Sequence, residues 1–149
     1  MEKQNYLFII SISLILLMFM LFFAYENQIQ NVPIHYGLDG KVTKYGYKSS
    51  LIIMLVVNII LLGFIFILSK NPDKLNYPID IDSNNKASTF RKMQIFLGIF
   101  SIIITSVFFI IFLNTIKALP EISNIIQILI FILFAFIPVV LFVLFRKSS

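Results

Sequence analysis

Four long apolar runs constrain this chain more than any other feature of its sequence. They cover about residues 7–25, 51–69, 94–116 and 123–145, and each approaches the roughly 20 residues that a helix needs to cross a bilayer. Only 13% of the residues are charged, against about a quarter in a typical soluble domain. The sequence therefore predicts a single all-α integral membrane domain over residues 1–149, with four transmembrane helices.

Polar and small residues inside the runs predict how the helices pack. Asn58 lies near the middle of the second run, and a lone carboxamide there usually bonds to a neighbouring helix. A contact between Asn58 and a transported substrate is the alternative. Gly98, Ser101 and Thr105 follow the spacing i, i+3 and i+7, which predicts one small-residue face that allows close helix packing. Pro138 predicts a bend in the last helix.

The positive charges flank the apolar runs and form no stripe, so the net charge of +5 does not indicate nucleic-acid binding. Cytoplasmic loops of membrane proteins are enriched in lysine and arginine. Eight of the 12 such residues lie in the two terminal segments and in the second polar loop, residues 70–93, and four lie in the other two loops. We therefore expect a multi-pass protein of the bacterial cell membrane with both termini cytoplasmic and the first loop facing outward.

The first loop, from residue 26 to residue 50, is the one long polar passage rich in β-branched and aromatic residues. Its Asp39-Gly40 pair is a turn signal, and the flanking segments are compatible with a short hairpin. We expect Pro33 to fix the entry to this turn unit and Gly40 to supply a positive φ. The sequence thus predicts an ordered outward loop.

Little in the sequence indicates catalysis or metal binding. The chain has no cysteine, which excludes thiolate sites. None of the four runs contains a charged residue or a histidine, although proton-coupled transporters usually carry one. His35 with Asp39 and Glu26 is the one candidate metal-ligand set, and the alternative is a structural His35 that is hydrogen-bonded within its own turn. We expect no enzyme activity, no cofactor and no metal.

The second polar loop matches only the beginning of a calcium-binding loop. Three of its side chains occupy the first ligand positions, but the glycine and the closing glutamate that such a loop requires are missing. We expect Ser88 or Thr89 to cap the third helix.

The first loop carries a pattern that resembles a known family. The residues of the pattern are Pro33-Ile34-His35, Gly40, Tyr45-Gly46 and Lys48. They resemble a bacterial membrane domain of unknown function, in which a Pro-X-His segment, a glycine and a closing lysine lie between the first two transmembrane helices. The resemblance covers about residues 7–90. The chain departs from the family where Val42-Thr43 replaces a proline–aspartate pair and where Tyr47 replaces a serine.

The resemblance implies a function outside catalysis. The same domain occurs in the immunity proteins that protect spore-forming bacteria from the sporulation-delaying peptide toxin, and those proteins also retain a repressor at the membrane. By this resemblance, the chain is an immunity or signalling accessory. Its partners would be the lipid bilayer and either a membrane-active peptide toxin or a cytoplasmic regulator, with a homo-oligomer as a further expectation. A small homo-oligomeric transporter is the alternative.

Overall fold

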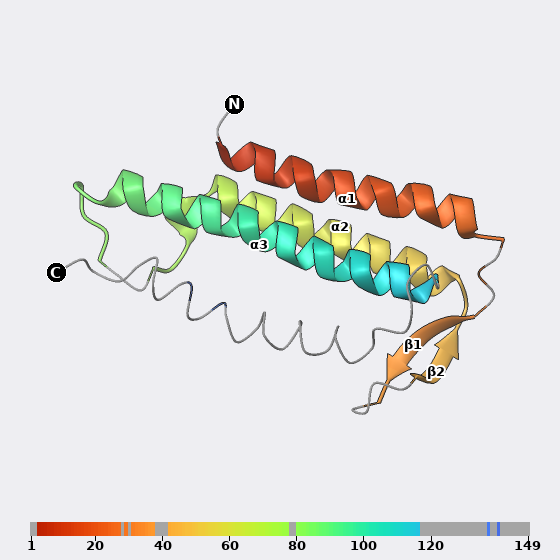
Figure 1. Cartoon of the computed structure of the whole chain (residues 1–149). Helices are drawn as coiled ribbons and strands as arrows, with labels where there is room; N and C mark the ends of the chain where they lie inside the picture. Colours follow the sequence, from red (N-terminus) through yellow and green to blue (C-terminus); the bar gives the residue numbers. More distant parts are fainter. Residues whose placement is uncertain are drawn as a thin grey trace.

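Three long helices lie side by side, and a small hairpin sits at one end of them (Figure 1). The computed structural model describes residues 3–27, 29, 31–37, 42–77, 80–116, 137 and 140. In chain order the elements are helix α1 (Lys3–Tyr25), strand β1 (Val32–Tyr36), strand β2 (Val42–Gly46), helix α2 (Ser49–Lys70), the 3₁₀ turn η1 (Pro72–Lys74) and helix α3 (Lys86–Thr115).

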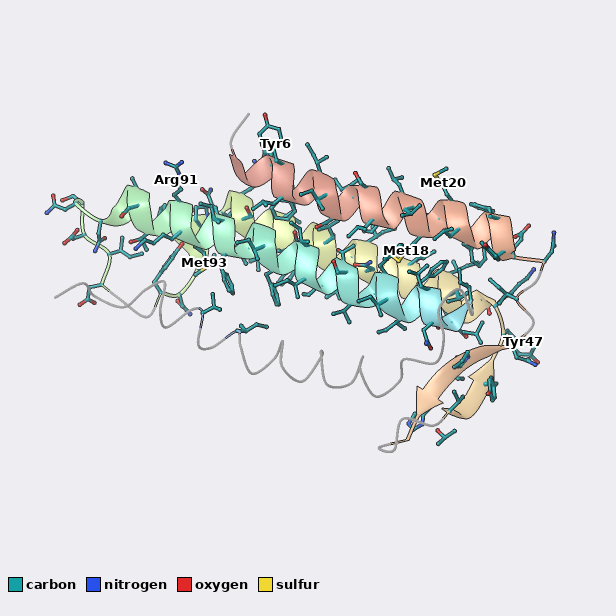
Figure 2. The ribbon with its side chains drawn as sticks, in the orientation of Figure 1. Tyr6, Met18, Met20, Tyr47, Arg91 and Met93 are labelled. Atoms are coloured by element: carbon teal, nitrogen blue, oxygen red, sulfur yellow. The ribbon has the colours of Figure 1, made fainter. Side chains whose placement is uncertain are left out.

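The three helices are long and apolar enough to cross a membrane. Many of their large apolar side chains are exposed on the outside of the helix group, where lipid tails would cover them. Met18 and Met20 of α1 illustrate the buried and the exposed environments of these side chains (Figure 2). Met18 points toward the other helices and is fully buried, whereas Met20 points away from them and is 70% exposed. This pattern is compatible with a membrane protein.

The prediction of four transmembrane helices is wrong, because the residues that the structure describes contain three candidate spans. The predicted span at residues 123–145, with Pro138, lies outside the described residues apart from positions 137 and 140. Hydropathy measures the cost of moving a segment into lipid. It carries no information about which apolar segments pack together, since that depends on the fit between helix surfaces.

Helix α3 begins at Lys86 after Asn85, so the predicted caps Ser88 and Thr89 are wrong and the helix starts a few residues earlier than they imply. The Asp82 carboxylate accepts the backbone N–H of Asn85 at 2.9 Å, and the Asn85 carboxamide accepts the backbone N–H of Asp82 at 3.0 Å. This reciprocal pair ends the loop before the helix starts. Ser88 and Thr89 therefore lie inside the first turns of α3, where Thr89 is buried. Short polar side chains at several neighbouring positions compete to end a loop, and local geometry decides among them.

The buried positions of α1 and α2 recur at alternating spacings of three and four residues, which is typical of helices packed along a shared seam. In α1 they are Phe8, Ser11, Ile15, Met18 and Phe22, and in α2 they are Leu51, Leu55, Asn58, Leu62, Ile65 and Ser69. Both seams therefore include polar side chains among the apolar ones.

Gly98 allows α3 to approach α1 closely. A Cβ atom at this position would lie only 2.6 Å from Leu7 Cδ1 and 3.0 Å from Leu7 Cβ. One turn further along α3, Ser101 Oγ donates to the Gly98 carbonyl at 2.7 Å and lies 3.1 Å from Ser11 Oγ. Either hydroxyl can be the donor between the two serines, since the Ser11 hydroxyl also lies 3.5 Å from the Leu7 carbonyl.

Gly98→Ala should destabilise the contact between α1 and α3 by about 1–3 kcal/mol, because the added methyl overlaps Leu7. The matched control is Gly63→Ala in α2, where an added Cβ meets nothing within 4 Å. Reversible unfolding in mixed micelles measures both changes. Equal stabilities of the two variants would contradict the close packing at Gly98.

Candidate functional site

The loop between α1 and α2 forms a two-stranded antiparallel hairpin at the end of the helix group (Figure 1). Val32 pairs with Gly46, and Pro33 pairs with Tyr45. Val32 is buried in the same core as the helices, whereas the centre of β2 is exposed. The base of the hairpin is therefore packed against the helices while its second strand faces outward.

Gly46 allows the hairpin to join α2 without an intervening linker. A Cβ atom at Gly46 would lie 2.9 Å from Ile34 Cγ2 and 3.1 Å from Ser50 Oγ. The backbone N–H of Ser50 donates to the Tyr47 carbonyl at 2.9 Å, so the chain turns directly from the strand into the helix. The absence of a side chain at Gly46 thus lets β1 and the start of α2 meet at one point.

His35 is hydrogen-bonded to Thr43 across the hairpin. Its Nδ1 contacts Thr43 Oγ1, and the Thr43 hydroxyl also lies 3.3 Å from the His35 carbonyl. A hydroxyl has one proton, so Thr43 can donate either to the carbonyl or to Nδ1, and the imidazole tautomer decides which.

The contact between His35 and Thr43 results from irregular strand pairing on both sides of His35. Sequence reasoning did not identify Thr43 as the partner of His35. Lys44 is the residue opposite His35, and the register shifts between Pro33 and His35 and again between His35 and Tyr36. In a regular ladder Thr43 would project from the face opposite to His35, because successive side chains alternate. A bulge changes this relation, and the sequence pattern contains no signal for it.

The metal-ligand set that the sequence suggested is only partly described. Asp39 lies outside the described residues, as does Gly40, and Glu26 follows the end of α1. Among the described residues, no group of three or more histidine, aspartate or glutamate side chains is placed to hold a metal ion.

The outer surface of the hairpin is cationic and aromatic. Tyr45 is 60% exposed, and Tyr47 is 82% exposed beside the junction with α2 (Figure 2). Lys44 and Lys48 are exposed in the same segment. Lys48 is the residue immediately before α2, and its side chain makes no capping hydrogen bond to the helix. Tyrosine and lysine together suit the headgroup level of a bilayer and the binding of anionic groups.

The helix-packing residues lie away from the hairpin, on two separate contacts of α3. Gly98 and Ser101 face α1, as described above. Thr105 faces α2, where its hydroxyl lies 3.5 Å from Asn58 Oδ1, a long hydrogen bond. Both side chains are buried, and Asn58 Nδ2 has no hydrogen-bond partner in the part of the chain that the structure describes. Sequence reasoning did not identify Ser11 as the partner of Ser101.

The described part of the second loop packs against the helices at the end opposite the hairpin. The Tyr77 hydroxyl donates to the Pro72 carbonyl at 2.8 Å, and its ring stacks on Phe90 of α3 at 5.8 Å. Partial burial, with a further contribution from the Asp73 carboxylate, raises the pKa of Tyr77 above its ordinary value. These contacts connect the end of α2 to the start of α3.

Comparison with protein-family models, curated proteins and solved structures finds no match to this chain. The likeness to the membrane domain of unknown function therefore stays a resemblance carried by the residues of the hairpin.

We predict that neutral His35 is protonated on Nδ1 and donates to Thr43, which leaves the Thr43 proton for the His35 carbonyl. Nitrogen NMR of the single imidazole at alkaline pH measures the tautomer. Thr43→Val should shift the ring toward the Nε2-protonated form, whereas Thr43→Ser should retain the parent spectrum.

An unchanged imidazole spectrum in Thr43→Val would contradict the assigned hydrogen bond. A zinc titration separates this structural role from a metal site. If zinc protected the parent hairpin from proteolysis but not the His35→Ala hairpin, His35 would be a metal ligand.

Proposed function

We propose that this chain is a non-enzymatic protein of the bacterial cell membrane, an immunity or signalling accessory that acts by binding a membrane-active peptide with its outward hairpin. The observation that carries the proposal is the attachment of the hairpin: Gly46 packs against Ile34 and Ser50, so the exposed strand is held at the start of α2. The loop pattern that resembles the immunity-protein domain is the same segment.

The position of the hairpin suits interception of a peptide. A peptide that disrupts bilayers must first reach the headgroup region, and exposed Tyr45, Tyr47 and Lys48 are residues that favour that region. A peptide bound there would be held before it inserts. In a signalling role, occupancy would favour one packing of α2 over another and so reach the second loop and a cytoplasmic regulator.

The contacts between helices support this transmission. α2 runs from the hairpin at one end to Lys70 at the other, where Lys70 Nζ donates to Asn5 Oδ1 of α1 at 3.0 Å. Gln94 of α3 donates to the Ser69 carbonyl at 3.1 Å. A shift of α2 would therefore change its contacts with both α1 and α3 at the end farthest from the hairpin.

The rival transporter function receives less support. It requires Asn58 to face a water-filled cavity shared between copies of the chain. Asn58 is instead fully buried and directed to Thr105 of the same chain, which supports a packing role.

The proposed orientation places the hairpin outside and the second loop in the cytoplasm, in agreement with the excess of lysine and arginine in that loop. We predict that a single cysteine at Lys44 reacts with an impermeant thiol reagent on intact cells and that one at Lys86 does not. The chain has no natural cysteine, so each label reports one position. Labelling at position 86 and none at 44 would invert the orientation.

The proposed function is tested by measuring the survival of cells that are challenged with peptides. Cells that produce the parent chain are challenged with synthetic peptides that correspond to small secreted products encoded beside its gene. The parent should raise the lethal concentration of one such peptide. Gly46→Val should lose this protection, because the added side chain overlaps Ile34 and displaces the hairpin.

The matched control is Gly63→Val in α2, which has open space around it and should protect like the parent. Cysteine labelling confirms that both variants insert. Full protection by Gly46→Val, or none by the parent against any of these peptides, would reject immunity through the hairpin.

A further inference from the structure

The hairpin has two outer edges, and they differ in their ability to pair with another strand. It forms a sheet of two strands, so each strand is paired on one side among the described residues. In an antiparallel strand some backbone N–H and C=O groups point away from the partner. An unpaired row of such groups is a template for a further strand.

The outer edge of β1 is blocked in several ways. Pro33 lacks an N–H, and proline is tolerated in a strand where the missing donor faces away from the partner strand. The register irregularities flank His35, which interrupts any regular row of donors and acceptors. Val32 is buried and β1 contacts α2. A peptide cannot add to this edge as a regular strand.

The outer edge of β2 is more open, although one of the two register irregularities lies in this strand at Thr43, between the paired residues Lys44 and Val42. The segment Val42–Gly46 contains no proline, and its three central residues, Thr43, Lys44 and Tyr45, are exposed. In the part of the chain that the structure describes, no backbone hydrogen bond from this strand is recorded outside its pairing with β1. The edge is short but accessible, and Lys44 lies beside the irregularity as a paired residue.

The charge of Lys44 determines which kind of strand can pair favourably with the outer edge of β2. It is the central residue of the five in β2. A second copy of the chain that paired with the full strand about a two-fold axis would place Lys44 opposite its own counterpart. Like charges directly opposite one another are destabilising, whereas opposite charges stabilise a cross-strand pair. The edge therefore disfavours self-pairing and favours a carboxylate.

We propose that the outer edge of β2 binds an extended peptide by antiparallel strand addition, with an aspartate or glutamate of the peptide opposite Lys44. This inference rests on the proposed function and specifies how the hairpin holds its peptide. Backbone hydrogen bonds provide the binding, and side chains provide the selectivity. Because side chains alternate, Lys44 contacts the peptide on one face of the sheet and Tyr45 contacts it on the other.

The test uses the full chain, labelled with ¹⁵N, in phospholipid nanodiscs. The probe is the peptide valine-threonine-glutamate-threonine-valine with blocked ends, and its counterparts carry lysine at the centre or methyl groups on alternate backbone nitrogens. Shifts of the β2 amide signals measure binding. The parent should bind the glutamate peptide about two- to fivefold more tightly than the lysine peptide, and methylation that removes the backbone donors should abolish binding.

Lys44→Glu should reverse the preference between the two peptides. The control is Lys74→Glu, which changes the net charge equally at the opposite end of the helices and should keep the parent preference. An unchanged preference in Lys44→Glu, equal binding of the methylated peptide, or binding of none of the peptides would overturn the proposal. Shifts of the same amide signals with protein concentration alone would assign the edge to a second copy of the chain and also overturn it.

The experiments distinguish a failure of the strand-addition proposal from a failure of the proposed immunity function. Protection of cells without peptide binding at β2 would reject strand addition and leave the proposed function in place. Charge-dependent binding at β2 without protection against any peptide in the survival assay would reject the proposed immunity function.

Discussion

The close contact between α1 and α3 at Gly98 is the constraint on which the rest of the structure depends. Lipid tails are as apolar as the helix surfaces, so burial of apolar side chains alone does not hold helices together in a bilayer. Shape fit and hydrogen bonds must do so. Leu7 fills the space that a side chain at position 98 would need, and the paired hydroxyls of Ser11 and Ser101 continue the contact.

α3 is the helix that unites the group, because it contacts α1 on one face and α2 on another. The contacts with α2 are polar but incomplete. Thr105 reaches Asn58 only through a long bond, and Asn58 Nδ2 and Ser69 Oγ are buried without partners among the described residues. A buried polar atom without a partner costs about 1–3 kcal/mol. The packing of α2 against α3 is therefore weaker than its burial suggests.

The hairpin is stabilised by contacts between its own strands and by packing against the helices. Two strands alone are marginal in water, and here three contacts stabilise them: buried Val32, the fit of Gly46 against Ile34, and the bond between His35 and Thr43. Thr43 is one of the residues at which the chain departs from the family pattern that it resembles.

The sequence by itself determined the properties that depend on local chemistry. Runs of apolar residues placed α1, α2 and most of α3, and the turn signal with its β-branched flanks indicated the hairpin. Tertiary structure decided what depends on neighbours. Three helices, and not four, make up the described bundle. An irregular register brings Thr43 to His35, and Ser11 meets Ser101 across ninety positions of sequence. The physical reason is that hydropathy and turn propensity are properties of one segment, whereas packing, register and hydrogen-bond partners belong to pairs of segments.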